Sequence, residues 1–189
     1  YIYSDKKDIP CNILQDNTKI NIVYGSYSDK ECFHSFCKQC DLITYEFENI
    51  DISLLQSVNI PIYPSINYLE IIQDKYIQKE YLCNNGLCVG PFCKIDTIET
   101  IYHFLHKHNY PIMIKARKGS FDGRGNQVIN NKEELLLWEQ QTKQIQNYYI
   151  ESYIEFDNEL SICGCNSKQN IICYEPVKNT HKQNILLQT

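Results

Sequence analysis

With 189 residues, 43% of them hydrophobic, the chain is long enough to bury one large core or two small ones. Its formal net charge of −5 provides none of the basic surface that nucleic-acid binding usually requires, so we exclude a nucleic-acid partner. The sequence has no apolar run of about 18 residues and no signal-like start, so we expect a cytoplasmic protein without a membrane span.

Strand and helix patterns alternate in the first third of the chain. The patterns indicate a strand and turn at 19–27, a helix at 28–40 with Ser28 as its N-cap, a strand at 41–47 and a helix start at 51–58. This alternation predicts a parallel α/β sheet. Residues 67–86 have apolar positions at helical intervals and predict one helix that ends at Gly86, which we interpret as a hinge between two domains, 1–66 and 67–189.

The second region opens with a helix at 96–109, for which Asp96 and Glu99 have the spacing of a capping box. His103, His106 and His108 lie on or beside it, and a solvated helix face is favoured over metal ligation. Further patterns follow in chain order: a strand at 110–116, a glycine-rich turn at 117–126, a strand at 127–130, a helix at 131–144, a strand at 147–154 and a strand pair at 159–165 and 170–177.

Ten cysteines raise the question of a metal site. Cys32, Cys37 and Cys40 have the C-x4-C-x2-C spacing of plant-type iron–sulfur ligands. Together with Phe33 and Phe36 they also recur at helical intervals, and the stretch lacks loop-forming residues, so we prefer the buried stripe of an amphipathic helix. We expect reduced, structural thiols.

The segment 114–129 differs in composition from the rest of the chain. It holds both arginines, Arg117 and Arg124, the only alanine and three of the seven glycines. A glycine-rich turn lets backbone N–H groups approach an anion, and the arginines with Lys115 and Lys118 add positive charge, which favours phosphate. The spacing matches neither the phosphate loop of nucleotide hydrolases nor the dinucleotide-binding turn, so a mobile surface hairpin remains the alternative.

The same stretch, "YPIMIKARKGSFDGRGNQVI", resembles the nucleotide-binding hairpin of ATP-grasp ligases. Within that superfamily, residues 41–50, 63–82, 149–162 and 174–186 each resemble the corresponding block of the 5-(carboxyamino)imidazole ribonucleotide synthetase family, in its fungal-like form. The resemblance implies an ATP-grasp fold of the α/β class. A truncated N-terminal parallel α/β (pre-ATP-grasp) domain would be followed by ATP-grasp subdomains with a glycine-rich hairpin lid.

The resemblance also implies an activity. Members of the family carboxylate 5-aminoimidazole ribonucleotide with ATP, Mg²⁺ and bicarbonate, through a carboxyphosphate, as part of phosphoribosylaminoimidazole carboxylase in purine (IMP) biosynthesis. A homodimer and a downstream mutase domain or subunit are compatible with it. Two alternatives stay open: another ATP-grasp carboxylate–amine ligase, and a non-catalytic nucleotide-binding fragment.

Site residues follow from the resemblance position by position. Catalytic roles fall to Lys115, Arg124 and His181. The nucleotide site takes in Lys75, Lys115, Ser120, Phe121, Asp122, Gly123, Arg124, Gly125, Asn126, Glu151, Ser152, Tyr153, Ile154, Glu159 and His181. The ribonucleotide substrate is expected at Glu46, Phe121 and Asp122. For Lys75, Glu151 and Glu159 the alternative is a solvated surface charge.

Two departures from the family pattern qualify these expectations. Phe121 stands where the family usually has tyrosine, so it can stack on the substrate but cannot donate a hydroxyl hydrogen bond. The family's N-terminal glycine-rich turn and its magnesium carboxylates have no counterpart in this sequence, so we assign no metal ligands. We therefore expect a fragment that is inactive by itself.

Overall fold

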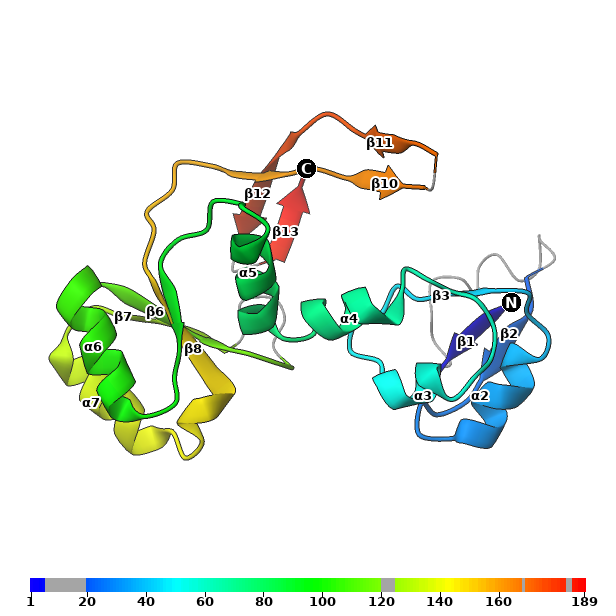
Figure 1. The fold of residues 1–189 in the computed structure, drawn as a ribbon, viewed down its shortest axis with the longest axis horizontal. Coiled ribbons are helices and arrows are strands. Elements are labelled where there is room, and N and C mark those ends of the chain that lie inside the picture. Colours follow the sequence, from blue (N-terminus) through cyan, green and yellow to red (C-terminus); the bar gives the residue numbers. More distant parts are fainter. Residues whose placement is uncertain (6–19, 120–124, 168, 183–184) are drawn as a thin grey trace. The chain divides into compact units, whose positions relative to one another are not determined.

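The structure is a computed structural model that describes residues 1–5, 20–119, 125–167, 169–182 and 185–189 (Figure 1). It divides into two compact units, Tyr1–Gly86 and Leu87–Thr189. Each unit is described by itself below.

The first unit combines short parallel strand pairs with helices. In chain order its elements are β1 (Ile2–Ser4), β2 (Ile22–Tyr24), α2 (Lys30–Cys37), β3 (Ile43–Thr44), α3 (Ile52–Gln56), β4 (Ile62–Tyr63), α4 (Ile66–Ile72) and α5 (Lys75–Asn84). β1 pairs with β2 and β3 pairs with β4, both in parallel, which confirms the predicted parallel pairing. Its core consists of Phe33, Phe36, Cys37, Ile43, Ile50, Leu54, Leu55 and Leu69.

Two helix boundaries in this unit differ from the prediction. The N-cap of α2 is Asp29, whose carboxylate accepts from the N–H of Cys32, and not Ser28. Residues 67–86 form two helices, because the buried Asp74 accepts from the N–H groups of Tyr76 and Ile77 and so begins α5. Gly86, with φ of 79°, follows the end of α5.

The division between the units lies later than the boundary expected at residues 66 and 67. The reason is that Leu69 of α4 is fully buried in the core of the first unit. Gln73, which caps α4, also donates from Nε2 to the carbonyls of Glu48 and Ile50, at 2.7 and 2.8 Å. These contacts join α4 to the loop that follows β3.

The second unit is richer in strands. Its elements are β5 (Phe92–Lys94), α6 (Ile98–His108), β6 (Ile112–Ala116), β7 (Asn126–Ile129), α7 (Lys132–Gln141), the 3₁₀ turn η1 (Ile145–Asn147), β8 (Tyr148–Ser152), β9 (Glu159–Ser161), β10 (Gly164–Asn166), β11 (Ile171–Cys173), β12 (Val177–Lys182) and β13 (Ile185–Gln188). The N-cap of α6 is Thr97 and its capping partner is Thr100, so the predicted pair of Asp96 and Glu99 was wrong.

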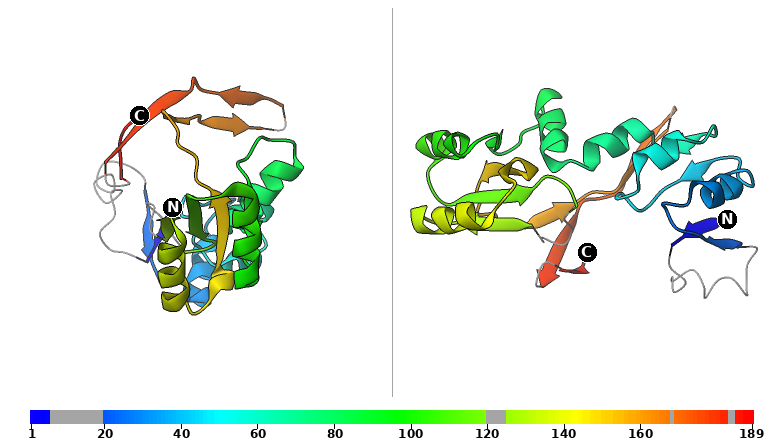
Figure 2. Two further views of the ribbon diagram at one scale, coloured as in Figure 1. Left: turned by 90° about the vertical axis from the view of Figure 1, so that its left-hand side faces the viewer. Right: turned by 90° about the horizontal axis from the view of Figure 1, so that it is seen from below.

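An antiparallel sheet in the order β5-β8-β6-β7 forms the centre of this unit. The helices α6 and α7 lie along one side of it (Figures 1 and 2). That side carries Ile112 and Ile114 of β6 and Ile150 of β8, which pack with Phe104 of α6 and Trp138 of α7. Because side chains alternate along a strand, Met113 and Lys115 face the opposite side of the sheet.

The remaining strands do not pair as predicted, because residues 159–165 and 170–177 do not form one simple strand pair. β10 and β11 form an antiparallel pair, whereas β9 pairs with β12, and β12 pairs on its other edge with β13. The predicted strand 159–165 is therefore two strands that belong to two sheets. This arrangement places Glu159 on β9 and His181 on β12 of one sheet.

Candidate functional site

A pocket of about 900 Å³ in the second unit brings together several of the predicted site residues. Lys115 reaches it from β6, Asn126 from β7, Glu159 from β9 and His181 from β12. The rest of its lining consists of Met113, Phe156, Asp157, Asn158, Lys178, Asn179, Thr180 and Leu186. The pocket therefore offers cationic groups and carboxylates to one ligand.

Lys115 forms an ion pair with Glu151, whose Oε1 lies 2.5 Å from Nζ. Lys115 stands opposite Tyr149 in the β6–β8 register, so Glu151 is its diagonal neighbour on the same face of the sheet. The Glu151 side chain is 10% exposed and that of Lys115 is 25% exposed. Lys115 therefore lines the pocket, while the mostly buried carboxylate of Glu151, outside the pocket lining, balances its charge.

Glu159 and His181 also form a pair, since Nε2 of His181 lies 3.4 Å from Oε1 of Glu159. The same oxygen accepts a hydrogen bond of 3.1 Å from the side-chain amide of Asn179. A carboxylate held in this way is suited to accept hydrogen bonds from neighbouring hydroxyl groups. An imidazole beside it can donate to an anion.

The residues after Glu151 lie at the end of β8, outside the lining of this pocket. The N–H of Ser152 donates to the carbonyl of Pro91, and the N–H of Tyr153 donates to that of Pro111. Any backbone contact of these two residues with a base would therefore have to use their carbonyl groups. Ile154 is 53% exposed and can provide an apolar surface.

The glycine-rich turn joins β6 to β7 as predicted, because Lys115 pairs with Asn126 and the N–H of Ala116 donates to the carbonyl of Gly125. Gly119 and Gly125 have φ of 69° and 83°, values that favour glycine. The expected phosphate and substrate residues of the lid, Ser120, Phe121, Asp122, Gly123 and Arg124, lie outside the described residues.

The other two expected site residues belong to the first unit. Lys75 is the first residue of α5, directly after the capping Asp74. Glu46 is exposed and lines a pocket of about 640 Å³ together with Tyr27 and Phe47, whose rings stack at 6.2 Å.

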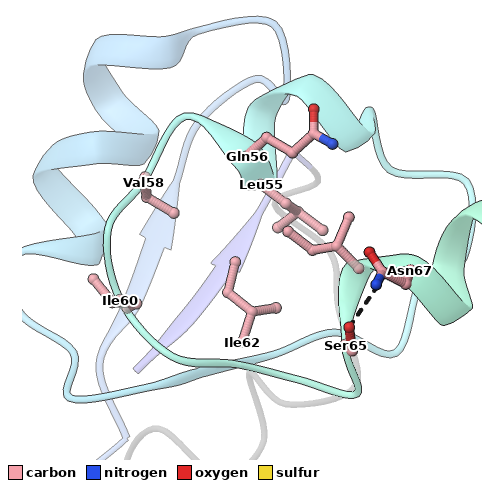
Figure 3. A pocket seen from close by; sticks show the side chains of 8 residues that line it. Leu55, Gln56, Val58, Ile60, Ile62, Ser65 and Asn67 are labelled. Carbon is pink, nitrogen blue, oxygen red and sulfur yellow. Dashed lines mark hydrogen bonds between the residues drawn. The ribbon is translucent and has the colours of Figure 1, made fainter.

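A further pocket of the first unit, of about 350 Å³, lies between α3, β4 and α4 (Figure 3). Leu55, Val58, Ile60 and Ile62 contribute apolar side chains to its lining, and Ser65 at its edge accepts from the N–H of Asn67. No predicted site residue lines it.

Within the described part of the chain, no group of three or more His, Cys, Asp or Glu side chains is arranged to hold a metal ion. Phe33, Phe36 and Cys37 of α2 are buried, which confirms that part of the predicted stripe. Cys32 is only half-buried, and Cys40 is half-buried and lies after the end of α2. Among the same described residues, none of the helices has the length and apolar character needed to cross a membrane.

Family models match segments that cover most of both units. The profile of the ATP-grasp domain matches residues 80–189, and that of the ribonucleotide synthetase pre-ATP-grasp domain matches residues 1–73. The chain belongs to the ATP-grasp family. Its fold class is therefore confirmed as an ATP-grasp fold preceded by a pre-ATP-grasp domain.

Individual ATP-grasp relatives confirm the narrower resemblance. The chain is 30% identical to N5-carboxyaminoimidazole ribonucleotide synthase of Staphylococcus aureus over 97% of its own length and 48% of that protein. It is 30% identical to phosphoribosylaminoimidazole carboxylase of Saccharomyces cerevisiae over 92% of its length and 31% of that protein. The crystal structure of the S. aureus synthetase complexed with ADP superposes with a TM-score of 0.84 at 27% identity, covering 97% of this chain and 49% of that one. The chain thus spans about half the length of the S. aureus synthase and about a third of the length of the S. cerevisiae carboxylase.

Sequence reasoning missed several residues of the ATP-grasp pocket. Asn179 is the most informative of them, because it contacts Glu159 directly. It stands two residues before His181 on β12, but the strand register shifts between Thr180 and His181, so simple alternation of side chains gave no signal for it. The sequence also gave no signal that Lys178 or the segment Phe156–Asn158 would line the pocket.

Proposed function

We propose that the chain is the nucleotide-binding portion of an enzyme that carboxylates 5-aminoimidazole ribonucleotide with ATP and bicarbonate. Two observations support this. The chain resembles N5-carboxyaminoimidazole ribonucleotide synthases over nearly its whole length. Independently, Lys115, Glu159 and His181, which come from three strands, line one pocket.

The described residues of the pocket fit the parts of ATP. Lys115 is a point charge on a long stem and would hold the phosphate oxygens, assisted by His181. Glu159 would accept hydrogen bonds from the ribose hydroxyls. Ile154, which lies outside the pocket lining, would contact the adenine ring. Arg124 and the glycines of the 120–126 segment would complete the phosphate site.

In the proposed reaction, an oxygen of bicarbonate attacks the terminal phosphorus of ATP, which yields carboxyphosphate and ADP. The amine of 5-aminoimidazole ribonucleotide then attacks the carboxyl carbon, and inorganic phosphate leaves. Lys115 stabilises the negative charge that spreads over the transferred phosphoryl group. Glu46, Phe121 and Asp122 are the residues proposed for the ribonucleotide. Mg²⁺ would help to neutralise the negative charge of the transferred phosphoryl group, and no ligand for it is assigned in this chain.

The test measures phosphate release from ATP by the whole enzyme of which this chain is proposed to be a portion, with 5-aminoimidazole ribonucleotide and bicarbonate, and with each omitted in turn. We expect release to require both substrates in wild type, and Glu159→Gln to raise the KM for ATP. Glu133→Gln on α7 is the matched control, because Glu133 is exposed and does not line the pocket.

Three results would contradict the proposal. Stimulation by a different amine or carboxylate substrate, but not by the ribonucleotide, would indicate another ATP-grasp ligase. ATP binding without turnover under any of these conditions would indicate a non-catalytic module. Absence of ATP binding would remove the nucleotide assignment. A cytoplasmic location, a homodimer and a downstream mutase domain stay predictions.

A further inference from the structure

Asn179 connects β12 to β9 and to Thr189, the residue after β13, beside the carboxylate of Glu159. It lies on β12 directly opposite Glu159 of β9 in the strand register. Its Nδ2 donates to Oε1 of Glu159 at 3.1 Å. Its Oδ1 accepts from the hydroxyl of Ser161 at 3.0 Å and from that of Thr189 at 3.1 Å.

These partners determine which way the amide points. An ionised carboxylate can only accept hydrogen bonds, so the nitrogen of the amide must face Glu159. Two hydroxyl groups hold the amide oxygen on the other side. A flipped amide would set its oxygen against the Glu159 carboxylate, so the Asn179 side chain is fixed in one orientation.

Glu159 depends on this contact because its own side chain is 48% exposed. An exposed glutamate samples several rotamers, and holding it in one of them costs conformational entropy. Asn179 and His181 both engage Oε1. Among the described residues, no side chain donates a hydrogen bond to Oε2, which is the oxygen left for a ligand.

We propose that Asn179 is a positioning residue that fixes the Glu159 carboxylate so that Oε2 accepts hydrogen bonds from the ribose hydroxyls of the nucleotide. This inference rests on the proposed nucleotide site. It assigns to Asn179 a share of the selectivity for ribonucleotides, exerted through Glu159 and without contact with the phosphates.

The experiment compares the Kd of ATP with that of 2′,3′-dideoxy-ATP for the full chain, by isothermal titration calorimetry. Wild type should bind ATP more tightly, and Asn179→Ala should weaken ATP about tenfold, since a hydrogen bond to a charged group is lost. Its Kd for the dideoxy nucleotide should stay unchanged, because that ligand has no ribose hydroxyls for Glu159. Asn179→Leu, which keeps about the same side-chain size and removes the N–H donors without adding a negative charge beside Glu159, should behave in the same way.

Asn166→Ala is the matched control, because Asn166 is exposed on β10 and does not line the pocket. It should change neither Kd. In the double variant of Asn179→Ala with Glu159→Gln, the two effects on ATP should be less than additive, because both act on one contact.

Equal weakening of both nucleotides by Asn179→Ala and Asn179→Leu would overturn the proposal, because it would mean a general structural role. An unchanged Kd for ATP in both variants would overturn it as well. Wild type that binds both nucleotides equally would refute the ribose assignment while leaving nucleotide binding intact. Wild type that binds neither would refute the proposed function itself.

Discussion

At the residue scale, a substitution of Lys115 should affect both catalysis and stability, because Lys115 pairs with the buried carboxylate of Glu151. Lys115→Met should lower ATP turnover about a hundredfold or more, since it removes a cation from the phosphates. It should also destabilise the fold by about 2 kcal/mol, discounted for the partial exposure of Lys115, because the Glu151 carboxylate loses its cation. Adding Glu151→Gln should recover most of the stability and none of the turnover. Chemical denaturation and phosphate release measure the two effects separately.

Lys94→Met is the control for this prediction. Lys94 pairs with Asp96 at 2.7 Å, but their side chains are 42% and 61% exposed, so its loss should change stability little. If the double variant were no more stable than Lys115→Met alone, the ion pair would not be the source of the loss. If turnover survived in Lys115→Met, the lysine would have only a structural role.

Cys37 provides a second residue-scale prediction. Burial, reinforced by Cys40, raises the pKa of the Cys37 thiol from 9.0 to about 11. The fold therefore favours the neutral thiol, and this contribution is fully present below pH 9 and is lost as the pH rises toward 11. Cys37→Val should reduce the fall in the unfolding midpoint between pH 9 and pH 11.

The burial of Cys37 can also be tested by labelling. At neutral pH, iodoacetamide should modify the exposed Cys83 in the folded chain and leave Cys37 intact, as read by mass spectrometry. Equal labelling of both would contradict the buried assignment.

At the scale of elements, the break between α4 and α5 depends on Asp74. Its carboxylate accepts from two N–H groups of the first turn of α5, at 3.1 and 3.3 Å. Asp74→Ala should cost about 1–2 kcal/mol of stability and should speed amide exchange at the start of α5, where Lys75 lies. Asp74→Asn should cost less, because asparagine also caps well. Asp51→Ala, at the exposed cap of α3, is the matched control and should leave exchange in α5 unchanged. Unchanged exchange in Asp74→Ala would show that α5 begins without this cap.

The positions of helices could be predicted from sequence better than their first residues. Ser28 and Asp29 are both good caps, but the hydroxyl of Ser28 is 2.7 Å from that of Ser26, which leaves the cap to Asp29. Asp96 pairs with Lys94, and Thr97 takes the cap of α6 instead. In each case a contact with a neighbouring residue decided between candidates that propensity ranks alike.

The candidate site could also be predicted only in part from the sequence. The hairpin of β6 and β7 and the position of Lys115 follow from the glycine-rich turn and the apolar strand before it. The Lys115–Glu151 pair could not be predicted, because it depends on the register between strands far apart in the sequence. Asn179 was missed for a related reason, since its importance comes from Glu159 on another strand. Short motifs therefore indicated the ligand, and strand pairing determined which side chains meet.

At the scale of the whole molecule, the described residues bury two separate clusters, one in each unit. Leu54 belongs to the first cluster and Ile114 to the second, and each is 1% exposed. Replacing either by alanine removes buried methyl groups and leaves a cavity, at a cost of about 2–5 kcal/mol. Because the clusters share no residue, we expect each substitution to weaken the unit that contains it.

The single tryptophan makes this expectation testable. Trp138 is 4% exposed in the second cluster, with the Tyr148 ring edge-on at 5.6 Å, so its fluorescence reports on the second unit. Ile114→Ala should lower the denaturation midpoint seen by tryptophan fluorescence. Leu54→Ala should leave that midpoint unchanged and lower the midpoint of a separate transition seen by circular dichroism, since the helices of the first unit contribute to that signal. If Leu54→Ala shifted the fluorescence midpoint as far as Ile114→Ala does, the two units would unfold as one cooperative body, and the two-domain interpretation of the chain would fail in solution.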